Sequence, residues 1–167
     1  MDLYNSSPAA CAIWDAADEH LLAMYGFSII DIMKHNPKEK TIHFGGIKGQ
    51  AICQRYTNMT YDTLDKDGSV KTLPLFTDIN IRTQRYTFSH PNSLLFITQF
   101  VQIALVITEK ATFDDMRSKG LIQCNSAFAG HSLGEYSALT SITDVLPISS
   151  LVDASMSGLR DVLNFSP

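Results

Sequence analysis

The sequence predicts an α/β fold, and three consecutive stretches carry that prediction. Apolar residues that step by three or four positions predict one long helix over residues 93–119. They are Phe96, Phe100, Ile103, Ile107 and Ala111. A short apolar run at residues 127–129 leads into Gly130 and is typical of a buried strand. Helix-forming residues follow at 133–141, and Pro147 opens a last helix. Helix, strand and helix in this order make an α/β unit.

Two helices are predicted in the first 37 residues. Ser7 is a suitable N-cap, Pro8 suits the first helical position, and Gly26 can end the helix. Apolar residues at helical spacing predict one buried face: Ile13, Ala17, Leu21 and Met24, with Trp14 beside them. A shorter helix is expected to begin after Ser28 and to stop before Pro37.

Residues 38–91 are richer in β-forming and turn residues. The segment 41–44 is predicted as a strand, and residues 56–61 and 70–76 as the arms of a hairpin. The turn at 65–68 reads DKDG, but with Gly68 at position six of a calcium loop, position twelve is Pro74 and not the required glutamate. The segment 45–49 reads GGIKG but lacks the Gly-Lys-Ser/Thr ending of a phosphate loop. Both are therefore interpreted as tight turns.

The composition excludes several classes of protein. In 167 residues, 45% are hydrophobic, 18% are charged and the net charge is −4. This describes a globular chain without a broad surface for nucleic acid or acidic membranes. The longest apolar run, residues 103–107, is too short to cross a bilayer, and no secretory signal is recognisable. Three widely spaced cysteines predict idle thiols in a reducing compartment and no metal site, so a cytoplasmic location is expected.

The pattern G-x-S-x-G at residues 130–134 fits a nucleophile elbow. Such an elbow turns a strand abruptly into a helix and leaves the serine oxygen exposed. Its flanking positions must be nearly free of side chains, because backbone crowds there. Ser132 is therefore the predicted nucleophile, and the backbone N–H of Leu133 is predicted to face a developing oxyanion. A plain strand-to-helix turn is the alternative interpretation.

A serine nucleophile also needs a base within hydrogen-bond reach. His131 is adjacent to Ser132, so its side chain is expected to point away from the serine. The other histidines all precede the elbow: His20, His35, His43 and His90. The α/β-hydrolase order of serine, acid and histidine is therefore impossible within this sequence. This argues against an ordinary serine hydrolase.

Residues 129–139 match more than a generic elbow. They read AGHSLGEYSAL, which resembles the malonyl-CoA:acyl-carrier-protein transacylase family. Residues 99–105, QFVQIAL, look like the Q-P-A-L segment that precedes the elbow in that family. Three further stretches resemble the malonyl/palmitoyl transferase domain in the β subunit of fungal fatty acid synthase: 1–4 (MDLY), 41–49 (TIHFGGIKG) and 113–122 (FDDMRSKGLI). The β-rich insertion points to the fungal domain, because bacterial stand-alone transacylases lack it.

The resemblance covers about residues 1–153 and implies a partial α/β-hydrolase-like acyltransferase core without the family's ferredoxin-like subdomain. It divides the chain into four parts. These are the N-terminal helices (1–37), the β-rich insertion (38–91), the core helix, strand and elbow (92–153), and a divergent tail (154–167).

The resemblance also implies the chemistry. Ser132 would take malonyl from coenzyme A as an ester and pass it to the phosphopantetheine thiol of acyl carrier protein. The fungal domain also returns palmitoyl to coenzyme A. Leu133 would supply one oxyanion N–H, and Gln102 and His131 would line the substrate site. No bound cofactor is implied, because the coenzyme A thioester and phosphopantetheine are substrates. The remainder of the synthase α/β complex would be a partner.

Several features of the family have no counterpart in this sequence. The Gly-Gln-Gly-Ser motif of the oxyanion hole precedes the MDLY segment in the family, and the catalytic histidine comes much later. The arginine that binds the malonyl carboxylate would fall at position 158, where this chain has Gly158, and Arg160 is two residues away. Ile103 replaces the usual proline, so the long helix is expected to run unbroken.

We therefore expect a fragment of the acyltransferase domain that has negligible transacylase activity by itself. Two alternatives stay open. The chain could be a non-catalytic piece for binding or assembly that pairs with a complementary chain, or the product of a truncated gene model without a function of its own.

Overall fold

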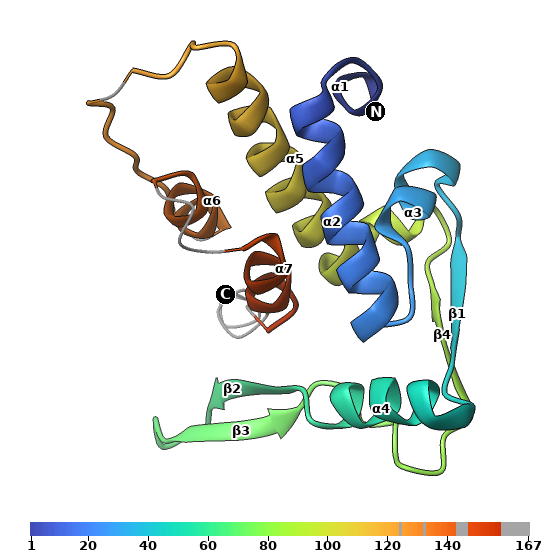
Figure 1. Cartoon of the computed structure of the whole chain (residues 1–167). Coiled ribbons are helices and arrows are strands. Elements are labelled where there is room, and N and C mark those ends of the chain that lie inside the picture. The colour runs from blue at the N-terminus through green and yellow to red at the C-terminus, as the bar shows by residue number, and fades with distance from the viewer. Residues whose placement is uncertain (124, 132, 143–146, 158–167) are drawn as a thin grey trace.

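The computed structural model describes residues 1–123, 125–131, 133–142 and 147–157 (Figure 1). The helices are α1 (Asp2–Ser6), α2 (Pro8–Met24), α3 (Ile29–His35), α4 (Gly46–Thr57), the 3-10 helix η1 (Leu94–Phe96), α5 (Thr98–Ser118), α6 (Leu133–Ile142) and α7 (Ile148–Ser157). The strands are β1 (Glu39–His43), β2 (Thr60–Leu64), β3 (Val70–Pro74) and β4 (Arg85–Ser89). This mixture of helices and small sheets is compatible with the predicted α/β class. None of the helices within these residues is long and apolar enough to cross a membrane.

Helices α2 and α5 lie side by side and form the centre of the helical body (Figure 1). Each contributes a stripe of buried side chains: Ala10, Trp14, Ala17 and Leu21 from α2, and Phe100, Ile103, Ile107 and Ala111 from α5. On α2 the sequence prediction holds for Trp14, Ala17 and Leu21, whereas the predicted Ile13 and Met24 are only partly buried. Helix α5 runs unbroken through Ile103, which confirms the expectation for that position. Burying these two faces against each other removes apolar surface from water and stabilises the fold.

The predicted stripe is wrong at its first member, Phe96. The extended backbone of Ile97 ends η1 and delays the start of α5 to Thr98. Phe96 is therefore outside the long helix and 66% exposed, and its ring stacks on His90 with centroids 5.3 Å apart.

Serine side chains cap the N-termini of both helices that were predicted in the first 37 residues, α2 and α3. Ser7 accepts a hydrogen bond from the Ala10 N–H at 3.3 Å. Ser28 accepts one from the Asp31 N–H at 3.0 Å and donates another to the Asp18 carboxylate at 2.8 Å. The short helix α1 was not predicted from the sequence.

We expect Ser28→Ala to lower the free energy of unfolding by about 1–2 kcal/mol, because it removes both the cap of α3 and a hydrogen bond to the Asp18 carboxylate. Ser7→Ala is the matched control and should cost less, since its capping bond is longer, at 3.3 Å, and its contact with the Asp115 carboxylate is secondary to that of Lys119. Denaturant unfolding of both variants measures the difference. Equal losses would contradict the role of the Asp18 contact.

The predicted insertion forms two separate two-stranded antiparallel sheets, β1 with β4 and β2 with β3. The hairpin prediction is confirmed, and its turn is closed by a Gly68 N–H to Asp65 carbonyl bond of 2.9 Å. Its first arm begins at Thr60 and not at Tyr56, because Tyr56 is fully buried at the end of α4.

Helix α4 corrects the interpretation of residues 45–49 as a tight turn, because these residues begin a helix. Its buried Ile52, Cys53 and Tyr56 tie it to the rest of the core. Gly49 allows a close approach, since a Cβ there would lie 2.4 Å from the carbonyl carbon of Phe44. Packing of this helix on the end of β1 thus overrides a glycine-rich local sequence.

The prediction of a buried strand at residues 127–129 is also wrong. Ala127 and Ala129 are exposed, Phe128 is partly exposed, and the segment is in neither sheet. A strand needs a neighbour to take its backbone hydrogen bonds. Both sheets of the described chain are made by residues 38–91, so no strand lies beside this segment to pair with it.

Candidate functional site

The predicted elbow, residues 130–134, lies at the start of α6, which begins at Leu133. Ser132 lies outside the described residues, as do Gly158 and Arg160. Leu133 is the first residue of α6, where a backbone N–H has no partner within its own helix. Leu133 also packs against the hydrophobic core. The helix start that the sequence predicted at this residue is confirmed, whereas the oxyanion role of its N–H stays a prediction.

The two elbow glycines differ in what surrounds them. A Cβ on Gly130 would lie 2.1 Å from the carbonyl carbon of Gly134 and 2.6 Å from the nitrogen of Glu135. At Gly134 such an atom would meet nothing within 4 Å. The expected crowding is therefore present at the first glycine and absent at the second. The Gly134 N–H bonds to the His131 carbonyl at 3.0 Å, which tightens the entry into α6.

The substrate-lining role predicted for Gln102 and His131 has no direct test in the structure. His131 is exposed immediately before the start of α6. Gln102 is half-buried on α5, two helical turns before Glu109, which accepts a hydrogen bond from Ser137 of α6. Within the described part of the chain, no hydrogen bond joins Gln102 to His131 or Leu133.

Two of the histidines that precede the elbow, His20 and His90, make contacts away from α6. His20 of α2 lies 2.8 Å from the Asp153 carboxylate of α7, which also accepts a hydrogen bond from the Tyr25 hydroxyl at 2.7 Å. Burial, followed by the bond to this carboxylate, raises the pKa of Tyr25 above its ordinary value. His90 stacks on Phe96, as described above. Neither of these contacts is with α6, so neither brings a base to the elbow.

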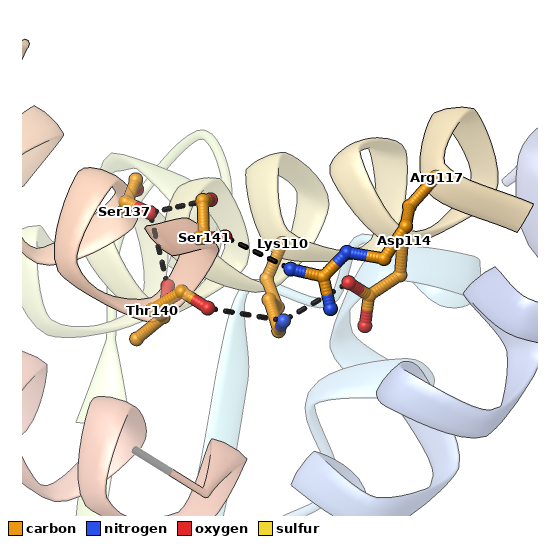
Figure 2. A network of polar contacts seen from close by, with 6 residues as sticks. All are labelled: Lys110, Asp114, Arg117, Ser137, Thr140 and Ser141. Atoms are coloured by element: carbon orange, nitrogen blue, oxygen red, sulfur yellow. Dashed lines mark hydrogen bonds and ion pairs between the residues drawn. The ribbon is translucent and has the colours of Figure 1, made fainter. Parts of the chain in front are cut away.

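A polar network joins α5 to α6 (Figure 2). Its centre is Lys110, whose ammonium lies 2.9 Å from the Asp114 carboxylate and donates to the Thr140 carbonyl at 3.1 Å. Arg117 donates to the Ser141 carbonyl at 2.9 Å. These carbonyls belong to the last turn of α6, where a helix leaves its C=O groups without internal partners. Two cations of α5 thus neutralise the negative end of α6, whose positive end begins at the elbow.

Sequence reasoning did not single out Lys110, although a signal was present. Lys110 follows Ile107 by three positions and therefore lies on the buried face of α5. Asp114 follows four residues later, which is the spacing of an ion pair along a helix. A lysine on an apolar stripe with an acid at this spacing indicates a buried, paired charge.

A pocket of about 310 Å³ lies between α5, residues 128–129 and one side of α6, along which its lining extends from Gly134 to Ser141. Phe113 and Phe128 form an apolar wall, with ring centroids 5.4 Å apart, and Glu109 and Ser137 are polar lining residues. Gly134 also lines it, so an apolar hollow lies beside the predicted elbow. A larger pocket of about 490 Å³ is lined by Tyr25 and by residues of α4, the hairpin and α7, and by none of α6.

Comparison with known proteins places the chain in a family. Residues 1–159 match the acyl transferase domain family. Over 153 residues, 92% of the chain, the sequence is 58% identical to fatty acid synthase subunit beta of Schizosaccharomyces pombe. It is 51% identical to the Saccharomyces cerevisiae subunit and 50% identical to the beta subunit pigK of Monascus ruber over the same length. The chain spans only 7–8% of the length of these relatives. The chain therefore belongs to the acyl transferase domain family, and it is similar to one segment of fungal fatty acid synthase beta subunits.

Proposed function

We propose that this chain supplies the nucleophile segment of an acyltransferase that moves malonyl, and in reverse palmitoyl, between coenzyme A and acyl carrier protein. One observation carries the proposal. In a chain of the acyl transferase family, a G-x-S-x-G sequence directly precedes a helix whose start is crowded at Gly130, as an elbow requires. Similarity to fatty acid synthase beta subunits supports fatty acid synthase as the setting.

In the proposed reaction, the Ser132 hydroxyl attacks the thioester carbonyl of malonyl-CoA and gives its proton to a base. The N–H of Leu133 stabilises the oxyanion, while Gln102 and His131 contact the substrate. The carbon–sulfur bond then breaks, and coenzyme A leaves as a thiol with that proton. The phosphopantetheine thiol of acyl carrier protein attacks the resulting ester and restores the serine. The coenzyme A thioester and phosphopantetheine act as substrates in this scheme, and no bound cofactor is proposed.

We further propose that the base and the cation for the malonyl carboxylate come from other parts of a fatty acid synthase. Inside this chain, His20 is engaged by Asp153 and His90 by Phe96. The isolated chain is therefore expected to show negligible turnover with malonyl-CoA and carrier protein. Turnover by the isolated chain that disappears in Ser132→Ala would contradict this expectation.

A chimera tests the proposed role directly. The 153 residues of this chain that match would replace their counterpart in the Schizosaccharomyces pombe beta subunit. Malonyl transfer to carrier protein is expected in the chimera. Ser132→Ala should reduce it at least about 10³-fold, because the covalent route is lost. Ser126→Ala, an exposed serine six residues earlier, is the matched control and should leave transfer unchanged. Equal rates for the chimera and its Ser132→Ala variant would refute the nucleophile assignment.

A further inference from the structure

We infer that Lys110 is a positioning residue for the elbow. From α5 it holds the C-terminal end of α6 and so fixes the direction in which the first turn of α6 points. The inference rests on the proposed function of Ser132, and it adds a residue that would never touch the substrate.

The burial of Lys110 is the first observation. Its side chain is 5% exposed, although lysine is almost never buried unless it is paired. A buried ammonium is costly in free energy unless its donors find partners. Lys110 finds two, the Asp114 carboxylate on its own helix and the Thr140 carbonyl on α6. The ring of Phe113 lies 5.8 Å from the same nitrogen.

The position of its partner on α6 is the second observation. Thr140 is in the last turn of that helix, thirty residues away in sequence from Lys110. Ser137, one turn closer to the elbow, donates to Glu109, the residue before Lys110. Neighbouring residues of α5 thus contact two successive turns of α6 (Figure 2 shows the Lys110 side). Arg117 adds a contact to Ser141, but its side chain is largely exposed, where such contacts contribute less.

The length of α6 links this contact to the site. Ten residues span about 15 Å, so a tilt of the C-terminal end displaces the first turn. Catalytic geometry is sensitive to displacements near 1 Å. Loss of Lys110 should therefore weaken the field that the first turn of α6 applies at position 132. A variant without Lys110 is expected to fold, because the hydrophobic core between α2 and α5 does not include the contact of Lys110 with Thr140.

A cysteine probe tests the inference in the full 167-residue chain without requiring turnover. Ser132→Cys is made with Cys11, Cys53 and Cys124 replaced by serine or alanine, and the rate of alkylation by iodoacetamide is followed against pH. A thiol at a helix N-terminus has a lowered pKa. The pKa of the thiol introduced by Ser132→Cys is therefore expected to be about 7.5, compared with about 8.5 for a free thiol. Adding Lys110→Met should return the thiol pKa toward about 8.5, which slows alkylation several-fold at pH 7.

Lys119→Met is the matched control. It removes the same charge from the same helix, where Lys119 pairs with Asp115 at 2.7 Å and is mostly exposed. The thiol pKa should stay lowered in this variant. A pKa that rises equally in both variants would show that net charge, and not the contact with Thr140, sets the value, and would overturn the inference.

The remaining outcomes separate this inference from the proposed function. A thiol with an ordinary pKa in the presence of Lys110 would contradict the elbow itself, and both proposals would fall. A lowered pKa that Lys110→Met leaves unchanged would overturn only the role of Lys110. If circular dichroism shows that Lys110→Met does not fold, the double variant Lys110→Met with Asp114→Asn removes both charges of the buried pair and leaves no unpaired carboxylate. A folded double variant with an undisturbed thiol pKa would equally overturn the inference.

Discussion

Replacing Phe100 with alanine is expected to lower the free energy of unfolding by about 3–5 kcal/mol. Phe100 is completely buried at the start of α5. Its ring contacts Phe27, after α2, at 5.0 Å and Phe88 of β4 at 5.1 Å, both edge to face. The ring thus joins the helical body to the β1–β4 sheet. Its loss removes apolar burial and leaves a cavity between three segments that cannot all close in.

Phe96→Ala is the matched control for this prediction. It deletes the same ring four residues earlier, where the side chain is 66% exposed. Urea unfolding should show a change within about 0.5 kcal/mol for this variant. Similar losses for both variants would mean that Phe100 is not the junction described above.

Gly130→Ala and Gly134→Ala are expected to have opposite effects on α6. A Cβ on Gly130 would collide with the backbone of Gly134, and overpacking of this kind costs about 1–3 kcal/mol. Backbone atoms cannot rotate aside as a side chain can, so the first turn of α6 must shift or open. At Gly134 the added methyl has open space, and alanine in a helix is favoured over glycine by about 0.5–1 kcal/mol.

Hydrogen exchange of the α6 amides distinguishes the two variants. We expect Gly130→Ala to accelerate exchange in α6 and Gly134→Ala to slow it slightly. In the chimera described above, Gly130→Ala should also lower malonyl transfer by about 10²-fold, since it displaces the predicted oxyanion donor. Slower exchange in Gly130→Ala would show that the close contact with Gly134 is not required.

The features that the sequence predicted correctly depend on residues close together along the chain. Ser28 caps α3 through the N–H of Asp31, three positions later. The turn of the β2–β3 hairpin uses Gly68 and the neighbouring Asp65. The apolar stripe of α5 repeats within each turn of one helix. Such signals contain their own partners, so periodicity and capping rules are sufficient to find them.

The failed predictions concern features whose partners are distant in sequence. Residues 45–49 look like a turn because glycines disfavour a helix, but α4 is stabilised by burial of Tyr56, whose hydroxyl donates to the carbonyl of the distant Tyr25. The apolar segment 127–129 has the composition of a strand, but no strand lies beside it in the described residues. A segment with this composition forms a strand only where a neighbouring strand is available to pair with its backbone N–H and C=O groups.

The sequence by itself determined the helices α2, α3, α5, α6 and α7, the G-x-S-x-G pattern and the resemblance to acyltransferases, because each depends on a short contiguous segment. Tertiary structure alone decided that residues 45–49 begin a helix and that Lys110 is buried in contact with Thr140. The second of these contacts forms only when α5 and α6 pack together. The energies of steric contact and of a buried charge depend on atoms that the fold brings near, whatever their separation along the chain.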